Sequence, residues 1–199
     1  MKYLFASDIH GSQTAAMKLK DKFYEEKADF LVLCGDLLYH GPRNDLPDGY
    51  NPKAVIEILN SLSDKIIAVR GNCDTEVDQM VLTFPMLSDY LLLTDNGIKM
   101  YVTHGHIYNA EKPLKLLKGD FLICGHTHVL RILEKDGFTY LNPGSITIPK
   151  ENNPQSYIIY ENKTFIIKDL DGKTIKELNV NVTQWSCYFI KCSQHKTSW

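Results

Sequence analysis

The stretch KYLFASDIHGSQTAAMKLKDKFYEEKADFLVLCGD, residues 2–36, contains the pattern that decides the fold. It begins with a short apolar run at 2–7, which predicts a buried strand. Residues 13–26 follow with apolar side chains at helical spacing, and Ser12 stands where a helix cap is expected. The run FLVLCG at 30–35 predicts a second buried strand. This order, short apolar strands separated by helices, predicts a mainly parallel sheet covered on both faces.

The rest of the chain first repeats this alternation and then changes character. Pro52 opens a predicted helix at 52–62, and KIIAVRG at 65–71 predicts a third strand. In the second half, short turn signals lie between strand-like runs and predict tight hairpins. These signals are Asn96-Gly97, Asp136-Gly137, Glu161-Asn162 and Asp171-Gly172. We therefore expect an α/β fold with two sheets facing each other and helices outside.

Bulk properties narrow the class of protein. A chain of 199 residues suits one domain, and a net charge of −2 with a pI near 6.4 gives no reason to expect nucleic acid or an anionic membrane as partner. No run approaches the about 18 apolar residues of a membrane span, and the first residues lack the apolar run of a signal peptide. Five cysteines, an odd number, fit a reducing compartment. We expect a cytoplasmic protein.

Polar side chains follow five predicted strands at their carboxyl ends. In open α/β sheets this edge is where ligands bind, and the neighbouring glycines let the backbone turn sharply there. The segments are Ser7-Asp8-Ile9-His10-Gly11, Gly35-Asp36, Gly71-Asn72-Cys73-Asp74, Thr103-His104-Gly105-His106 and Gly125-His126-Thr127-His128.

Carboxylate, amide and imidazole groups without a required thiolate suit Mn²⁺, Fe or Zn²⁺. Seven such side chains are too many for one closed site and fit two ions, and a short carboxylate such as Asp36 can bridge them. Two ions roughly 3.5–4 Å apart can hold a hydroxide and clamp a phosphoryl oxygen. The seven candidates are Asp8, His10, Asp36, Asn72, His104, His126 and His128.

Each of these motifs has an ordinary structural explanation. A single Asp-x-His at a strand end is usually a turn or a helix cap, and Asn72 alone could be a turn residue that tolerates a positive φ. The pair His126 and His128 could simply be solvated at a strand end. Five such coincidences at predicted carboxyl strand ends favour a metal site.

The order Asp-x-His, Gly-Asp, Gly-Asn-x-Asp, Gly-His and Gly-His-x-His resembles the calcineurin-like metallophosphoesterase superfamily. The segments SDIHG, CGDLLYHGPRN, VRGNCDTEVDQM, THGH, GHTH and NPGSITIPK are most similar to its small bacterial phosphodiesterases of the YfcE type. The resemblance covers residues 1–182 and implies one domain with a four-layer αββα sandwich of two mixed sheets with flanking helices. It leaves a tail at 183–199 without an assigned role.

The resemblance also implies how the ligands divide between two metal ions. Asp8, His10, Asp36 and His128 would hold one ion; Asp36, Asn72, His104 and His126 would hold the other. We expect Mn²⁺, with Zn²⁺, Fe or Ni²⁺ as alternatives. The implied activity is hydrolysis of a small phosphodiester by the hydroxide between the ions, with Asn72, Cys73 and His104 as catalytic residues.

Cys73 departs from the wider superfamily, in which many members have histidine after Gly-Asn. A thiol can donate a proton, with a reference pKa near 8.5, but it cannot offer the positive charge of an imidazolium. We therefore predict weak assistance to the leaving group and a preference for substrates with good leaving groups. A small buried strand-end residue is the alternative interpretation.

The loop HGPRN at 40–44 should overhang the same edge of the sheets. We predict substrate contacts for His40, Arg43 and Cys73, since a guanidinium suits a phosphate oxygen; a surface turn with a solvated arginine is the alternative. Two further functions stay open: a phosphomonoesterase, and a non-catalytic scaffold that binds protein partners, as the retromer scaffold subunit with a similar fold does. A homo-oligomer is compatible with the sequence.

Overall fold

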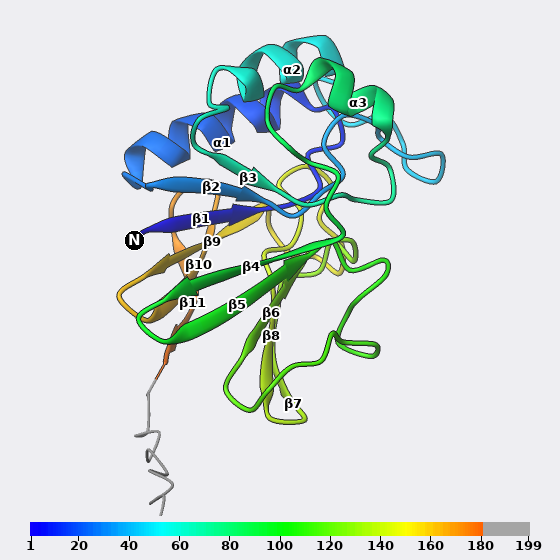
Figure 1. Ribbon diagram of the computed structural model, residues 1–199. Coiled ribbons are helices and arrows are strands. Elements are labelled where there is room, and N and C mark those ends of the chain that lie inside the picture. Colours follow the sequence, from blue (N-terminus) through cyan, green and yellow to red (C-terminus); the bar gives the residue numbers. More distant parts are fainter. Residues whose placement is uncertain (181–199) are drawn as a thin grey trace, which may run out of the picture.

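The protein folds into two sheets that face each other. A computed structural model describes residues 1–180, so the expected tail at 183–199 lies outside the described residues. The first sheet has six strands in the order β11-β10-β9-β1-β2-β3, and the second has five in the order β4-β5-β6-β8-β7 (Figure 1). Each sheet contains parallel and antiparallel pairs, which confirms the expected sandwich of two mixed sheets.

The bounds of the elements are as follows. The first sheet is formed by β1 (Tyr3–Ala6), β2 (Phe30–Leu33), β3 (Ile66–Ala68), β9 (Ser156–Glu161), β10 (Thr164–Asp169) and β11 (Thr174–Asn179). The second is formed by β4 (Tyr90–Asp95), β5 (Ile98–Thr103), β6 (Phe121–Cys124), β7 (Arg131–Lys135) and β8 (Phe138–Asn142). The helices are α1 (Gln13–Glu25), α2 (Pro52–Asn60) and α3 (Glu76–Val81).

Local capping explains where the helices begin. The side chain of Ser12 accepts a hydrogen bond from the backbone N–H of Ala15, as the sequence predicted, and Asn51 caps α2 just before Pro52. Helix α3 was not expected, because its six residues bury no apolar stripe. A capping box between Thr75 and Asp78 forms it instead.

The predicted hairpins are present. Asn96-Gly97 joins β4 to β5 and Asp136-Gly137 joins β7 to β8, with positive φ at both residues of each turn, as type I′ turns require. The turn between β9 and β10 consists of residues 162 and 163, one position later than predicted, and both have positive φ.

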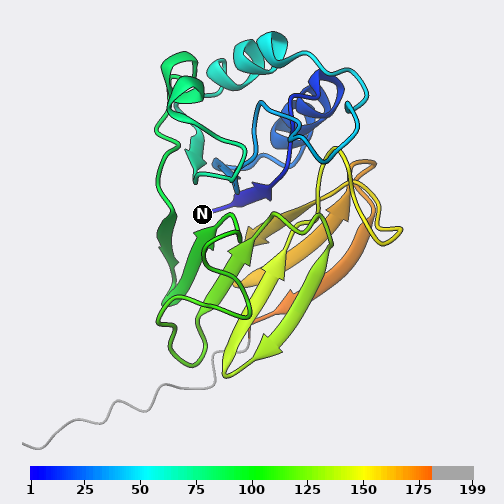
Figure 2. The ribbon, with the colours of Figure 1, turned by 90° about the vertical axis from the view of Figure 1, so that its right-hand side faces the viewer.

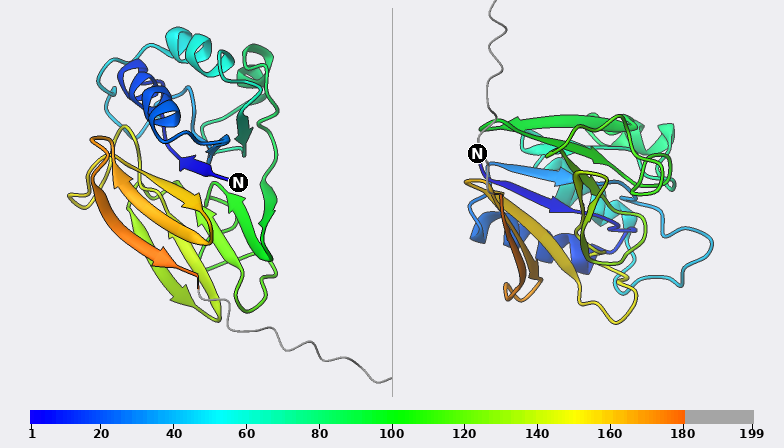
Figure 3. Two further views of the ribbon diagram at one scale, coloured as in Figure 1. Left: turned by 90° about the vertical axis from the view of Figure 1, so that its left-hand side faces the viewer. Right: turned by 90° about the horizontal axis from the view of Figure 1, so that it is seen from below.

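Alternating side chains of the strands enter different apolar layers. In β1, Leu4 and Ala6 pack with α1 and α2, whereas Tyr3 and Phe5 face the second sheet. The helices cover only the outer face of the first sheet (Figure 1; Figure 3, left). Side chains from the segment 105–120, which contains no helix, pack on the outer face of the second sheet. No helix within residues 1–180 is long and apolar enough to cross a membrane.

Candidate metal centre

The carboxyl ends of five strands meet at one rim of the sandwich. β1, β2 and β3 are parallel, and so are β5 and β6, so each group brings its polar strand-end residues to a common edge. The loop that follows β2 and the loop between β8 and β9 lie at this rim, above and below each other in Figure 2. The predicted convergence of Asp8, Asp36, His104 and His128 is therefore present.

Three groups of side chains there offer ligand atoms within 4.8 Å of one another. They are Asp8 with His10 and His128; Asp8 with Asp36 and His104; and His10 with Asp36 and Cys73. Asp36 is buried, and its Oδ2 lies 3.7 Å from His10 Nε2 and 3.4 Å from His104 Nε2, between the two imidazole sets. The arrangement fits a bridging carboxylate.

Three imidazoles are oriented by backbone carbonyls. Nδ1 of His10 lies 2.8 Å from the backbone oxygen of Tyr39. Nδ1 of His104 lies 2.7 Å from that of Cys34, and Nδ1 of His128 lies 2.9 Å from that of Ile148. Because a carbonyl only accepts, each Nδ1 carries the proton. In the neutral ring Nε2 then presents its lone pair to the centre of the site, as metal-ligating histidines do.

These lone pairs face other acceptors. Nε2 of His10 and Nε2 of His128 are 3.3 Å apart, and His128 Nε2 is 3.2 Å from Asp8 Oδ1. Asp8 Oδ1 is buried without a hydrogen-bond partner. A buried carboxylate oxygen surrounded by acceptors is costly unless a cation lies among them. The residues present therefore fit divalent cations with oxygen and imidazole ligands.

The buried carboxylates and imidazoles shift one another's pKa values. Burial would raise the pKa of Asp8, but the neighbouring His10 and His128 hold it well below its usual range. Burial would lower the pKa of His104, yet Asp36 and Asp8 raise it to about 9. A protonated His104 can donate from Nε2 to Asn72 Oδ1, which lies 3.1 Å away. A metal ion would take the place of this proton.

The backbone of the site is strained. Of the seven predicted ligands, five have positive φ, between 48° and 68°: Asp8, His10, Asp36, His126 and His128. Such values in residues other than glycine cost of order 1 kcal/mol each and gather at functional sites. The strain turns the side chains that end β1, β2 and β6 toward one centre.

Two glycines let the strand ends approach each other. A Cβ on Gly125 would lie 1.8 Å from Ser7 Oγ and 2.8 Å from Asp8 Oδ2. A Cβ on Gly35, whose φ is +93°, would lie 2.6 Å from the backbone nitrogen of Gly71. The sequence predicted that these glycines permit sharp turns; the structure adds that they allow two strand ends to touch.

Two predicted ligands lie at the edge of the cluster. Asn72 approaches it through His104, and its Nδ2 donates to Cys73 Sγ at 3.2 Å. The ring of His126 is 5.0 Å from that of His104 between centroids, and its backbone N–H donates to Asp8 Oδ2 at 3.1 Å. His126 belongs to none of the three groups, and Asn72 contacts the second of them through His104.

Asp74 was missed as a functional residue. Its carboxylate is 1% exposed and accepts three backbone hydrogen bonds, from Asp36 at 2.8 Å, Leu37 at 2.8 Å and Gly71 at 2.7 Å. Burial and the charge of Asp36 raise the pKa of Asp74 to about 6. It fixes the end of β2 against the end of β3. Its position directly after the Gly-Asn-Cys segment was the available signal.

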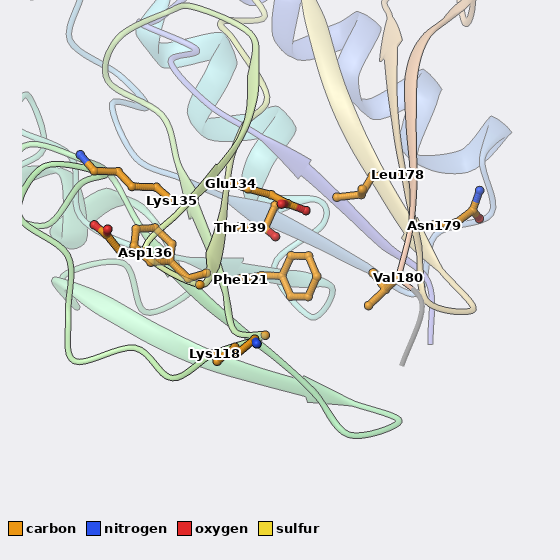
Figure 4. A pocket seen from close by; sticks show the side chains of 12 residues that line it. Lys118, Phe121, Glu134, Lys135, Asp136, Thr139, Leu178, Asn179 and Val180 are labelled. Atoms are coloured by element: carbon orange, nitrogen blue, oxygen red, sulfur yellow. The ribbon is translucent and has the colours of Figure 1, made fainter. Parts of the chain in front are cut away.

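A pocket of about 380 Å³ opens beside the cluster. Two of the three residues predicted to contact substrate, Arg43 and Cys73, line it. The third, His40, packs against Tyr50 with ring centroids 5.2 Å apart and is not among the lining residues. Burial and Asp36 raise the pKa of Cys73 to about 12, so its thiol is neutral at pH 7. A larger cavity, of about 600 Å³, lies elsewhere, between the β7–β8 hairpin and β11 (Figure 4).

Residues 1–164 match the model of the calcineurin-like phosphoesterase superfamily domain. The chain belongs to this superfamily. Phosphodiesterase YfcE of Escherichia coli K12 is 43% identical over 175 residues, which cover 88% of this chain and 95% of YfcE. The solved structure of E. coli YfcE superposes with a TM-score of 0.88 at 42% identity, covering 91% of this chain and all of that one.

More distant structures share the fold alone. Vps29 of Entamoeba histolytica, solved with Zn²⁺, has a TM-score of 0.59 and 22% identity, and the match covers 91% of this chain and all of Vps29. The superfamily and the likeness to YfcE identify the chain as a metallophosphoesterase, a hydrolase that acts on phosphoric ester bonds, as the sequence indicated.

Proposed function

We propose that this metallophosphoesterase hydrolyses small phosphodiesters with two divalent cations, Mn²⁺ first and Zn²⁺, Fe or Ni²⁺ as alternatives. The observation that carries this proposal is the buried Asp8 Oδ1, which faces imidazole nitrogens and has no donor. Two such cations supply Lewis acidity and a nucleophile formed from water at neutral pH. The name of the relative YfcE supports a diester as substrate.

The ligand sets are proposed as the sequence indicated. Asp8, His10, Asp36 and His128 hold one cation; Asp36, Asn72, His104 and His126 hold the other. The first set is supported by the group of Asp8, His10 and His128. The second set is supported by two contacts of His104 Nε2, which lies 3.4 Å from Asp36 Oδ2 and 3.1 Å from Asn72 Oδ1.

The other residues of the pocket act on the substrate. Arg43 is exposed on the pocket wall and pairs with no described carboxylate within 4.0 Å, so its guanidinium is available to a phosphate oxygen. Asn72, Cys73 and His104 stand closest to the reacting group in this arrangement. Because Cys73 offers a neutral thiol where an imidazolium would carry charge, esters with good leaving groups react best.

The test combines elemental analysis with two matched substrates. Purified protein loaded with Mn²⁺ should cleave bis(4-nitrophenyl) phosphate faster than 4-nitrophenyl phosphate and hold two metal ions per chain. Asp36→Ala and His128→Ala should each lose metal and reduce hydrolysis by more than about 100-fold. Asp64→Ala, at a side chain that is 77% exposed and outside the site, is the matched control and should change neither.

Each contrary outcome would identify a different function. Faster cleavage of the monoester would make the chain a phosphomonoesterase. Protein that holds no metal and cleaves neither ester with added Mn²⁺ would be a non-catalytic scaffold.

A further inference from the structure

Lys150, to which the sequence assigned no role, lines the same pocket as the candidate ligands. Its backbone is fixed to them, since its N–H donates to the His128 oxygen at 3.0 Å. The preceding segment is fixed as well: Ser145 Oγ donates to the backbone oxygen of Asp8 at 3.0 Å, and Thr147 Oγ1 donates to the backbone oxygen of Ile9 at 2.8 Å. The position of Lys150 relative to the metal cluster is therefore set by the backbone.

The side chain of Lys150, in contrast, is exposed and makes no ion pair within 4.0 Å among the described residues. Arg43 has the same two properties. The two cations come from different loops, Arg43 from the loop after β2 and Lys150 from the loop between β8 and β9, and these loops lie at the same rim (Figure 2). Asp36 is the one carboxylate among the described residues that line the pocket.

The lining offers little to an apolar ligand. Pro42 is its main apolar side chain, and it contains no Phe, Tyr or Trp. A volume of about 380 Å³ falls in the range of small-molecule sites, so there is room for more than the reacting phosphoryl group. A phosphodiester carries one negative charge, which two divalent cations already outweigh. Two further unpaired cations fit an additional anionic group on the substrate.

We propose that Lys150 and Arg43 form an anion subsite that selects phosphodiesters carrying a second phosphate on the alcohol portion of the substrate. Lys150 is here a specificity-determining residue and Arg43 its partner. This inference rests on the proposed phosphodiesterase activity and adds the class of substrate. The reaction remains hydrolysis of the diester bond, and the second phosphate is bound but unchanged.

The kinetic test uses two substrates with the same reacting bond. The 4-nitrophenyl ester of thymidine 5′-phosphate and the same compound with a 3′-phosphate both release 4-nitrophenol from one diester. The 3′-phosphate should raise kcat/KM about tenfold in the natural protein. Lys150→Ala should bring the ratio of the two kcat/KM values close to one, chiefly by lowering kcat/KM for the ester with the 3′-phosphate, and Lys150→Arg should keep the preference.

The binding test does not depend on turnover. Thymidine 3′,5′-bisphosphate should bind the Mn²⁺-loaded protein about tenfold more tightly than thymidine 5′-monophosphate in calorimetric titrations, and Lys150→Ala should abolish the difference. Lys176→Ala is the matched control: it removes the same charge from an exposed position on β11 outside the pocket, and should leave both ratios unchanged.

Three results would overturn the subsite. The natural protein could show no preference for the 3′-phosphate, Lys150→Ala could lower kcat/KM equally for both substrates, or Lys176→Ala could have the same effect as Lys150→Ala. In all three the diester is still cleaved. Absence of cleavage of either ester would instead overturn the proposed function, and the subsite with it.

Discussion

The backbone N–H of Asp36 donates to Asp74 Oδ2 at 2.8 Å, so the candidate bridging ligand at the end of β2 is held by a carboxylate that follows β3. The same carboxylate accepts from Leu37 and Gly71. Asp36 has a φ of 57°, a conformation that needs such support. Asp74 thus positions a ligand without facing the metal cluster.

Asp74→Asn should weaken this support, because an amide nitrogen replaces one acceptor oxygen in front of backbone N–H groups. We expect a loss of about 1–3 kcal/mol in the free energy of unfolding, and metal affinity lower by roughly 10–100-fold. Urea unfolding and metal titration measure the two effects. The exposed Asp64→Asn should leave both unchanged; unaltered metal affinity in Asp74→Asn would contradict a positioning role.

Gly125→Ala should disturb the site through a steric clash, since the new methyl group would meet Ser7 Oγ and Asp8 Oδ2. We expect a destabilisation of roughly 1–3 kcal/mol and a loss of bound metal. Gly97→Ala is the control: its Cβ would meet nothing within 4 Å, although φ is +82°, so it should cost about 1–2 kcal/mol through the backbone alone and keep the metal. Equal metal content in the two variants would contradict this explanation.

Removal of metal should destabilise the protein, because the buried Asp8 and Asp36 then lack their cations. At a free Mn²⁺ concentration of about 100 times Kd, binding contributes about 2.7 kcal/mol, which corresponds to a shift in Tm of about 5–10 °C for a chain of this size. Thermal unfolding with and without a chelator measures this shift. The Tm of Asp36→Ala should not change with the chelator. If the Tm of the natural protein did not change either, the prediction would be contradicted.

Cys73→His should improve leaving-group assistance, because an imidazolium can donate a proton and carry positive charge. We expect turnover of an alkyl phosphodiester to rise relative to an aryl one by about 100-fold, the lower end of general acid catalysis. Cys73→Ser, which offers no positive charge, should leave the ratio as it is. Unchanged rates of Cys73→His on both esters would count against the prediction.

Acid should weaken a contact far from the site. Glu26, just after α1, accepts from Lys168 at 2.7 Å and from Tyr157 at 2.9 Å. Burial would raise the pKa of Glu26, but these partners and Lys2 lower it. A depressed pKa in the folded state means that the stabilisation is present above the unfolded pKa, near 4.3, and is lost as pH falls through the folded one.

Glu26→Gln should therefore lower the free energy of unfolding by about 1–2 kcal/mol at pH 7 and by less at pH 3. Urea unfolding at the two pH values measures the difference. Glu25→Gln, whose side chain is 62% exposed and pairs with Lys22, is the control and should cost less than about 0.5 kcal/mol. An equal loss at both pH values would show that packing, not charge, is responsible.

Local patterns predicted the secondary structure well wherever the cause is local. Ser12 caps its own helix, and Asn96-Gly97 forms its own turn, so neighbouring residues suffice to predict them. α3 was not predicted because its side chains bury no surface that would leave a pattern. The outer cover of the second sheet was expected to be helical; it is formed by side chains of the segment 105–120, whose packing depends on distant residues such as Phe138.

By itself, the sequence determined the order of strands and helices, the hairpins, and the set of carboxylates and imidazoles that end the strands, because each depends on a few adjacent residues. Only the tertiary structure decided the direction of the imidazoles. Their Nδ1 atoms bond to the carbonyls of Cys34, Tyr39 and Ile148, up to 70 positions away. Asp74 likewise accepts from the backbone of a distant loop, and Lys150 lines the pocket from another one. Such contacts exist only after distant strands have met, because hydrogen-bond direction depends on spatial neighbours and not on sequence neighbours.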